Sequence, residues 1–281
     1  MSESYQTFNH IYRHYRRELL DAAKVDVGSW HSKSTQGNPL LVTREVPYAS
    51  FNMYMEVTQE RLAEAIQPNM PWAERHFMER IGGEPLNPPP SHELWPWSHG
   101  QHQAEMTEKF SHTYPERMWP RFANEGEVRP NERQVFVPHN GIRFEYGDLG
   151  DVVNLLTDDL YTRQAYLPIF FPEDTGGSNR IKERIPCSLG YHFMVRKTSA
   201  NVLAMDCMYT MRSCDFVRHF RDDIYMAARL LQWVALEVSR NRGEPNHDVV
   251  PRILRVHIAS LHIMEGDKYK LTEEEKNDGN R

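Results

Sequence analysis

The stretch DFVRHFRDDIYMAARLLQWVALEVSR, residues 215–240, carries the strongest helical pattern in the chain. Apolar side chains recur within it every three or four residues, which is the spacing of one face of an α-helix. They are Phe216, Phe220, Ile224, Ala227, Leu231, Val234 and Val238. We therefore expect a long helix over residues 216–239, and we expect it to be the central helix of the fold.

Strand-like segments lie on both sides of this helix in the sequence. Residues 188–197 and 201–212 read as two long strands, and KTSAN between them favours a hairpin. ILRVHIASLHIM, residues 253–264, indicates a final strand, and QAYLPIF, residues 164–170, indicates a shorter one. Together with a short helix expected at 150–160, this order predicts an α+β fold in which a mixed β-sheet is packed by a long central helix.

The N-terminal half has two predicted helices, over residues 5–24 and 49–67, each with apolar residues at helical spacing. Residues 80–133 contain three successive prolines, which disfavour regular structure, and several tryptophans. We expect a loop-rich insertion there that lines a site. The tail, residues 267–281, is expected to be flexible. No shift in composition divides the chain, so we expect a single domain over residues 1–281.

The composition limits the classes of function. Of the 281 residues, 40% are hydrophobic and 26% are charged, which is ordinary for a globular protein. The net charge of -6 disfavours a broad basic surface for nucleic acid. No apolar run reaches the roughly 18 residues that a membrane span needs, and the charged N-terminus is unlike a signal peptide. We therefore expect a cytoplasmic protein that binds neither nucleic acid nor membrane.

The cysteines and histidines give no metal or disulfide signature. The three cysteines, which have no CxxC spacing, are Cys187, Cys207 and Cys214. His99, His102 and His112 also lack the spacing of a closed zinc site, so we expect no bound metal. Cys187, in RIPCS (residues 184–188), is by itself compatible with a nucleophile or with a small apolar core residue.

A group of polar residues lies where a strand is expected to meet the central helix. Arg212, Ser213 and Asp215 can form an anion or phosphate site, because an arginine and a hydroxyl at a helix start bind such groups. The alternative is that Ser213 or Asp215 simply caps the helix. His219 and Asp223 are four residues apart, which is also the spacing of an ion pair on a helix surface.

The order of these segments resembles the thymidylate synthase family. RIPCS resembles the family's Pro-Cys dipeptide, and RSCD (212–215) resembles its nucleotide-binding segment. YTRQAYLPIF (161–170) resembles its phosphate-binding strand entry, and LHIM (261–264) resembles the segment with its last-strand histidine. The resemblance covers most of residues 150–265. Three family residues differ, because an arginine, a histidine and a tyrosine are replaced by Gln164, Ser188 and Met264.

A further difference concerns the base. The family has asparagine at the position of Asp223, and the asparagine amide bonds O4 and N3–H of uracil. A carboxyl group suits cytosine better, since it accepts from the N4 amino group and can share a proton with N3. The sequence, including FSHTYPERMWP (110–120), is thus similar to the deoxycytidylate hydroxymethylase branch of the family. Phage enzymes belong to this branch, and such an enzyme would work in the host cytoplasm.

The resemblance implies an enzyme that transfers a one-carbon unit. The reaction would be 5-hydroxymethylation of a cytidine monophosphate, with dCMP favoured, and the one-carbon unit would come from 5,10-methylenetetrahydrofolate. After transfer to C5, water would add to give the hydroxymethyl group. The resemblance also implies a homodimer through the sheet, in which Arg163 reaches the nucleotide across the subunit interface.

The resemblance assigns roles to individual residues. Cys187 would add to C6 of the base, and Glu56 and Asp223 would also act in catalysis. The nucleotide would be bound by Arg163, Arg212, Ser213, Asp223, His262 and Tyr114, and the folate by Asp215, Trp95 and Trp97. Glu60, one turn after Glu56 on the expected helix, is the alternative general acid or base.

Three alternative functions stay open. One is a CMP 5-hydroxymethylase of nucleoside-antibiotic biosynthesis, because Met264 leaves sugar selection undetermined. Another is a dUMP-using enzyme, either a thymidylate synthase or a hydroxymethylase. The third is a non-catalytic relative that binds nucleotide or folate without turnover, which the substitutions at Gln164, Ser188 and Met264 would allow.

Overall fold

A computed structural model describes residues 5–25, 29–30, 33–34, 38–97, 110, 112–120, 147–177, 185–243 and 249–279. Its centre is one mixed sheet in which the strands lie in the order β1-β5-β10-β8-β7-β6, with β2 paired to β5 and β9 paired to β10. These strands are β1 (Tyr5–Gln6), β2 (Lys24–Val25), β5 (Thr43–Tyr54), β6 (Tyr166–Pro168), β7 (Ser188–Lys197), β8 (Leu203–Met211), β9 (Cys214–Asp215) and β10 (Val249–Met264). A separate two-stranded sheet consists of β3 (Ser29–Trp30) and β4 (Lys33–Ser34).

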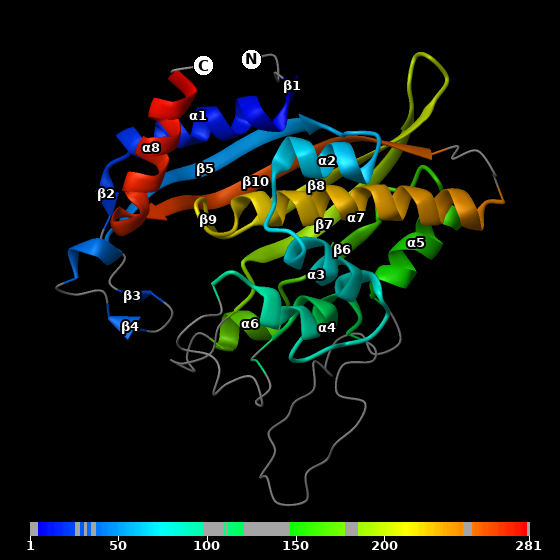
Figure 1. Cartoon of the computed structure of the whole chain (residues 1–281). Helices are drawn as coiled ribbons and strands as arrows, with labels where there is room; N and C mark the ends of the chain where they lie inside the picture. Colours follow the sequence, from blue (N-terminus) through cyan, green and yellow to red (C-terminus); the bar gives the residue numbers. More distant parts are fainter. Residues whose placement is uncertain are drawn as a thin grey trace, which may run out of the picture.

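The helices are distributed around this sheet. The α-helices are α1 (Phe8–Asp21), α2 (Gln59–Ile66), α3 (Trp72–Ile81), α4 (Tyr114–Met118), α5 (Leu149–Asp158), α6 (Pro172–Gly177), α7 (Phe220–Asn241) and α8 (Lys268–Gly279). The 3₁₀ helices are η1 (Pro39–Leu41), η2 (Pro90–Leu94) and η4 (Glu265–Asp267). The longest of them, α7, lies along the sheet, and α1 and α8 lie side by side near β5 (Figure 1).

The central position of α7 explains its sequence. It packs on β10 on one side and contacts α2, α3 and α5 on others, so it needs apolar residues around most of its circumference. Its buried apolar residues include Ile224, Ala227, Ala228, Leu231, Val234, Ala235 and Val238. The predicted central helix is confirmed, although it begins at Phe220 because the preceding residues form the turn that leaves β9.

The predicted sheet is also confirmed. β7 and β8 form the expected antiparallel hairpin, and β10 lies in the middle of the sheet, antiparallel to β5 and parallel to β8. The β7–β8 ladder shifts register between Ser188 and Gly190. Gly190 is required there, because a Cβ atom would collide with the side chain of Tyr166 on β6.

The helix predicted over residues 49–67 is wrong in its first half. Ala49, Phe51 and Met53 are buried on alternate residues of β5, which is strand periodicity, and β10 pairs with this segment. The helix α2 begins only after Thr58, whose side chain caps it. Within 80–133, the described residues include the end of α3 and the short helices η2 and α4, and η2 begins at Pro90, the last of the three successive prolines. Residues 98–109, 111 and 121–146 lie outside the described residues.

The prediction of a flexible tail is wrong for residues 268–279, which form α8. Leu271 is 1% exposed and belongs to the main hydrophobic core. Ion pairs join α8 to α1: Arg16 contacts Asp278 at 2.9 Å, and Arg17 contacts Glu275 at 3.5 Å. The tail sequence has a weak apolar pattern, so its docking depends on partners from the other end of the chain.

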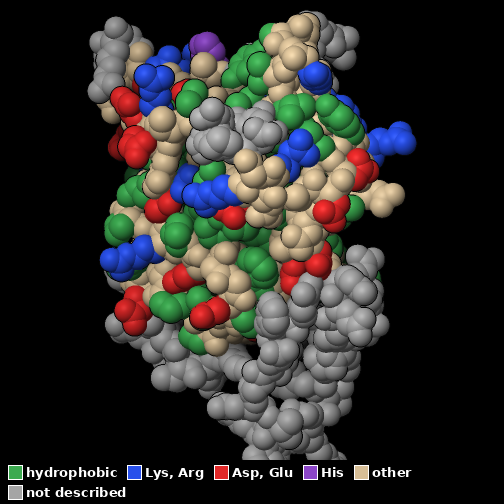
Figure 2. Space-filling model, turned by 90° about the vertical axis from the view of Figure 1, so that its right-hand side faces the viewer, with side chains coloured by type: hydrophobic (Ala, Val, Ile, Leu, Met, Phe, Trp, Pro, Cys, Tyr) green, Lys and Arg blue, Asp and Glu red, His purple; other side chains and the backbone are tan. Residues whose placement is uncertain are grey.

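The surface has no dominant charge on the face in Figure 2. Basic and acidic side chains are interspersed there, and hydrophobic side chains lie between them. No helix within the described ranges combines the length and the apolar character that crossing a membrane requires.

The packing of α8 predicts the effect of a core truncation. Leu271→Ala should lower the free energy of unfolding by about 2–4 kcal/mol, because it leaves a cavity in the core. Urea unfolding followed by circular dichroism would measure this difference. Lys276→Ala, at an exposed position of the same helix, is the matched control. A Leu271→Ala loss no larger than that of the control would show that α8 does not contribute to the core.

Candidate functional site

The β7–β8 hairpin brings Cys187 and Arg212 together, although they are 25 residues apart in the sequence. Each residue lies just beyond the hairpin ladder, in which Ser188 faces Met211. The backbone N–H of Arg212 donates to the carbonyl of Cys187 at 2.8 Å, which continues the pairing. Cys187 is partly exposed, whereas Cys207 and Cys214 are buried. Cys187 is therefore the only cysteine whose thiol can meet a ligand.

The guanidinium of Arg212 is held by the segment that carries Cys187. Its Nε donates to the carbonyl of Pro186 at 2.8 Å, and its Nη2 donates to the carbonyl of Ile185 at 3.0 Å. The same Nη2 lies 3.8 Å from Cys187 Sγ. A cation within contact distance of a partly exposed thiol is the setting in which reactive cysteines occur. Ser213, which follows Arg212, is partly exposed beside it.

A hydroxyl cluster lies next to Cys187. The buried Ser188 hydroxyl lies 2.6 Å from the hydroxyl of Tyr209 on β8, and it donates to the hydroxyl of Tyr114 at 3.2 Å. Tyr114 begins α4, whose start is fixed by a capping box between Thr113 and Glu116. Burial raises the pKa of the Tyr114 and Tyr209 hydroxyls, so both are neutral donors at physiological pH.

Asp223 lies on the first turn of α7 close to this cluster. The Cys214 thiol donates to Asp223 Oδ2 at 3.7 Å, and the carboxyl is only partly exposed. Burial raises the pKa of Asp223 to about 7, with the positive charge of Arg80 opposing the rise and the negative charge of Asp222 adding to it. The carboxyl is thus shared between its neutral and ionised forms near neutral pH. The surface ion pair considered for His219 and Asp223 does not describe this environment.

Arg80 was not identified from the sequence. It lies near the end of α3, is 3% exposed, and has its guanidinium carbon 4.0 Å from the ring centroid of Tyr114. The start of α3 is tied to α7 by Asn69, which donates to Asp222, and its end is tied to η2 by Glu79, which accepts from Ser91. The sequence feature that could have indicated its burial is its place on the buried face of α3. This face is formed at helical spacing by Trp72, Ala73, His76, Phe77 and Arg80.

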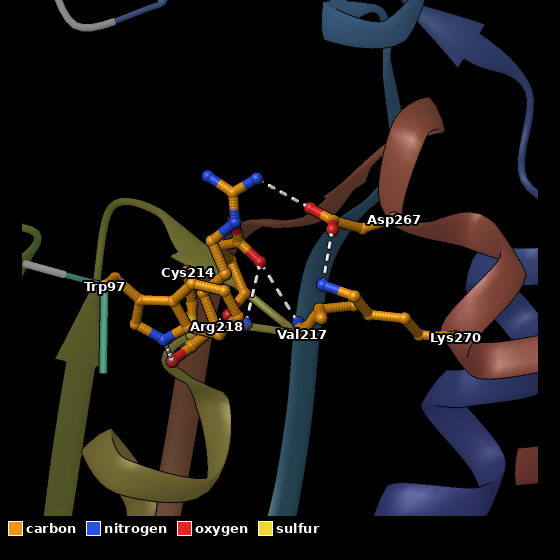
Figure 3. Close-up of polar contacts among 7 residues, drawn as sticks. Trp97, Cys214, Val217, Arg218, Asp267 and Lys270 are labelled. Carbon is orange, nitrogen blue, oxygen red and sulfur yellow. Dashed lines mark hydrogen bonds and ion pairs between the residues drawn. The ribbon is translucent and has the colours of Figure 1, made fainter. Parts of the chain in front are cut away.

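Asp215 forms the second part of the site, at the turn between β9 and α7. Its Oδ1 accepts from the backbone N–H groups of Val217 and Arg218, each at 3.1 Å (Figure 3). Sheet pairing places Asp215 opposite His262 of β10. Burial raises the pKa of the Asp215 carboxyl, while His262 and Arg218 oppose the rise. Asp215 thus stabilises the turn before α7, as the capping alternative predicted in part.

The two tryptophans lie around this turn. Trp97 Nε1 donates to the carbonyl of Arg218 at 3.2 Å, and the Arg218 guanidinium and the Lys270 ammonium lie over the Trp97 ring at 5.5 and 5.1 Å. Asp267 accepts from both cations at 2.8 Å, so η4 and α8 contribute to the same cluster (Figure 3).

Trp95 packs nearby. Its ring stacks on His219 with centroids 5.7 Å apart, and it also contacts Trp72 of α3. Both tryptophans therefore lie at the start of α7, although each already has partners within the chain.

Two residues with predicted roles lie outside the cluster. Glu56 follows β5 rather than lying on a helix, and its carbonyl accepts from Gln232. Gln232 is nine residues after Asp223 on α7, which corresponds to roughly 13 Å along the helix axis. The alternative, Glu60, is exposed at the start of α2.

Arg163 lies at the edge of the sheet. It is exposed, and its carbonyl is 3.0 Å from the ring of His192 on β7. His192 is four residues, or roughly 13 Å, from Ser188 along the strand. Arg163 of the same chain therefore does not approach Cys187.

Metal ligation has little support in the part of the chain that the structure describes. No group of three or more His, Cys, Asp or Glu side chains is arranged to hold a metal ion among those residues. His112 packs edge-on against Tyr114 at a centroid distance of 6.5 Å. His99 and His102 lie outside the described residues.

A scan against models of protein families finds no match to this sequence, and a search of curated proteins finds no similar sequence. The resemblance noted above therefore depends on the residues and spacings that carry it. The geometry adds that six of the predicted site residues lie around the end of one hairpin and the start of α7. They are Cys187, Arg212, Asp215, Asp223, His262 and Tyr114.

The environment of Asp223 predicts a pH dependence of stability. Between the ordinary carboxyl pKa near 4 and about 7, native Asp223 holds a proton that the unfolded chain releases. The free energy of unfolding should therefore fall as pH rises through this window. Asp223→Asn should remove this contribution, so wild type should lose up to about 1.4 kcal/mol more per pH unit than the variant.

Urea unfolding at several pH values between 4.5 and 7.5 would measure both slopes. Asp215 and Asp222 titrate in both proteins, and since their charges act on Asp223, the difference between the slopes reports Asp223 together with its coupling to these two carboxyls. Equal slopes would contradict the raised pKa of Asp223.

Proposed function

We propose that the chain is a folate-dependent one-carbon transferase of the thymidylate synthase type that hydroxymethylates C5 of a cytidine monophosphate, with dCMP as the favoured substrate. The observation that carries the proposal is the joint presence of a partly exposed thiol beside a guanidinium and, nearby, a carboxyl poised between two protonation states. The mixed sheet, with Cys187 at the start of β7 and His262 opposite Asp215, supports this type of fold.

The Cys187 thiol supplies the first chemical step of the proposed reaction. C5 of a pyrimidine is a poor nucleophile, and addition of a thiolate to C6 makes the ring enamine-like, so that C5 attacks an electrophilic carbon. Arg212 keeps the 185–187 segment in place through two carbonyls and presents its positive charge to Sγ. The same charge is available to a nucleotide phosphate that lies beside Ser213.

We assign to Asp223 the recognition of the pyrimidine ring of the nucleotide. In its neutral form the carboxyl offers one O–H donor and one carbonyl acceptor, which match N3 and the N4 amino group of cytosine. Its position near neutrality lets it give a proton to N3 while the thiolate adds to C6, and take the proton back later. Tyr114, which is neutral and bonded to Ser188, supplies a hydroxyl to the same site.

The co-substrate 5,10-methylenetetrahydrofolate would supply the one-carbon unit. Asp215 and the faces of Trp95 and Trp97 lie at the start of α7, where a flat heteroaromatic ring with N–H donors would find a carboxyl and aromatic surface. Asp215 Oδ1 is already used by the turn, and Oδ2 lies 3.7 Å from Arg218 Nε, so such a donor would share Oδ2 with this guanidinium. Arg163, exposed at the sheet edge, is assigned to a nucleotide bound by the second subunit of a homodimer.

A dUMP-using enzyme is the second candidate, and the neutral form of Asp223 is the observation that favours it. A neutral carboxyl can also donate to O4 and accept from N3–H, which is the uracil pattern. The choice between dCMP and CMP concerns the sugar, because the two nucleotides have the same base. Met264, at the position of the family tyrosine, is 1% exposed and so offers little to a sugar.

Release of tritium from C5 tests the proposed reaction. Nucleotides labelled at C5 (dCMP, CMP and dUMP) incubated with methylenetetrahydrofolate should release tritium fastest from dCMP, and mass analysis should show a hydroxymethyl product. Cys187→Ser should lower this release by on the order of 10³-fold or more, because the step needs a thiolate. Cys207→Ala, which alters a buried cysteine on β8, is the matched control and should stay active. No release from any of the three nucleotides would refute the proposal.

Replacement of Asp223 tests the choice of base. Asp223→Asn offers an amide N–H that cannot ionise, so the ratio of kcat/KM for dCMP to that for dUMP should fall at least about tenfold, which is ~1.4 kcal/mol. Asp158→Asn, which makes the same change at an exposed aspartate at the end of α5, is the control. An unchanged ratio in Asp223→Asn would remove Asp223 from base recognition.

A further inference from the structure

Three hydroxyl groups form a hydrogen-bonded chain that begins one residue after Cys187. The Ser188 side chain, at the start of β7, is fully buried, and its hydroxyl lies 2.6 Å from the hydroxyl of Tyr209 on β8. The same Ser188 hydroxyl donates to the hydroxyl of Tyr114 at 3.2 Å. Tyr209 is fully buried, whereas Tyr114 is partly exposed at the start of α4. The chain therefore connects the interior of the sheet to a side chain that a ligand can reach.

The strand register explains why Ser188 and Tyr209 meet. Ser188 pairs with Met211, and Tyr209 lies two residues before Met211 on the same face of β8. A diagonal neighbour of this kind lies within reach of an aromatic side chain. The Tyr209 ring is held by Tyr191, its cross-strand partner on β7, with centroids 4.5 Å apart and the ring planes within 2°. The Ser188–Tyr209 contact is thus fixed by the sheet.

Tyr114 is held from the other end of the chain. Its backbone begins α4 after the capping box of Thr113 and Glu116, and the Thr113 hydroxyl also donates to the carbonyl of Leu86 at 2.7 Å. The guanidinium of Arg80 lies over the Tyr114 ring, 4.0 Å from its centroid. Because both the backbone and the ring are fixed, the freedom that the Tyr114 hydroxyl retains is the direction of its proton.

The number of protons sets the direction of each hydrogen bond. Each hydroxyl has one proton, and burial raises the pKa of both tyrosines, so that they keep it at physiological pH. Ser188 gives its proton to the bond with Tyr114. The 2.6 Å contact also needs a proton between its oxygens, so Tyr209 is the donor to Ser188. The Tyr114 proton is left over, and no acceptor for it is found among the described residues.

The remaining proton of Tyr114 suits a ring that Cys187 attacks. When a thiolate adds to C6 of a pyrimidine, electron density moves onto the other ring atoms and their substituents. A donor that is already aimed at the place where charge develops lowers the barrier, because nothing has to reorient during the reaction. Hydrogen bonds of this kind are often long before the substrate binds, as is the 3.2 Å bond from Ser188.

We propose that Ser188 is a positioning residue that, with Tyr209 as its own donor, keeps the Tyr114 hydroxyl turned as a hydrogen-bond donor toward the pyrimidine that adds to Cys187. This inference rests on the proposed function, since it concerns the same nucleotide and the same thiol. Ser188 is buried and acts only through Tyr114. A Ser188 that merely filled space in the core would affect the enzyme equally with and without the Tyr114 hydroxyl.

A double-mutant cycle separates these two roles. Ser188→Ala, Tyr114→Phe and the double variant are compared by kcat for release of tritium from C5 of dCMP. We expect Tyr114→Phe to lower kcat by about 10²-fold and Ser188→Ala by about tenfold, with KM for dCMP changed less than about threefold. In the Tyr114→Phe background, Ser188→Ala should lower kcat by less than about twofold, because the hydroxyl that it positions is gone.

The matched control is Ser239→Ala. Ser239 is also a buried serine, 1% exposed, and its hydroxyl donates to the carbonyl of Ala235 within α7. It lies 16 residues after Asp223, which corresponds to roughly 24 Å along the helix axis. Ser239→Ala should therefore leave kcat unchanged.

Tyr209→Phe tests the same chain by a second route, because it keeps the buried ring and removes only the hydroxyl that donates to Ser188. We expect kcat to fall about threefold, and only while Tyr114 retains its hydroxyl. The Tyr209→Phe cycle decides the question if Ser188→Ala does not fold.

Carbon-13 NMR of protein labelled at tyrosine Cζ reports the hydroxyl chain without substrate. The Tyr114 and Tyr209 signals are assigned with the two phenylalanine variants. Both signals should shift in Ser188→Ala, because each hydroxyl loses its partner, and both should stay in place in Ser239→Ala.

The outcomes distinguish the two proposals. If dCMP is turned over, the positioning role is overturned by an equal loss of kcat from Ser188→Ala in both backgrounds, by no loss in either, or by a Tyr114 signal that does not move. No tritium release by wild type, with the Tyr114 signal still moving in Ser188→Ala, refutes the proposed function, and the role of Ser188 in that reaction is refuted with it.

Discussion

The pairing of β10 with strands on both sides is the constraint on which the rest of the structure depends. Its backbone bonds to β5 and β8 fix the sheet, and its extension past β8 pairs with β9, so that His262 faces Asp215. The turn after β9 then sets the start of α7, and α7 in turn positions α3. The site is therefore built by hydrogen-bond register, and its side chains come together because the strands end where they do.

The long regular elements were predictable because their patterns are local. The central helix, the hairpin of β7 and β8, and β10 each repeat a clear period over ten or more residues. Segment 49–54 was predicted as helix because Phe51 and Met55 are four residues apart, which is a helical spacing, and only pairing with β10 shows that the segment is a strand. The helix α8 could not be predicted, because its partners on α1 are some 260 residues away in the sequence.

The candidate site also contains some residues that the sequence could identify and others that it could not. Cys187, Arg212 and Asp215 could be selected from motif spacing, and the structure brings the first two together at the end of the hairpin. Glu56 was selected by its distance from a motif, and the turn after β5 takes it elsewhere. Arg80 could not be assigned in advance, since its effect on Asp223 is electrostatic and needs burial and tertiary proximity. Sequence spacing can identify residues that lie at the same end of neighbouring strands. It cannot identify residues that influence one another electrostatically across the fold.

The attachment of α8 to α1 has a consequence for the conditions under which the molecule is studied. The contacts include Arg13 with Asp278 and Arg17 with Glu275, whose side chains are substantially exposed, and mobile ions screen such pairs. The same helix contributes Lys270, which binds Asp267 beside Arg218. Ionic strength should thus govern how often the C-terminal segment opens locally, and hydrogen exchange at the start of α7 should follow that opening.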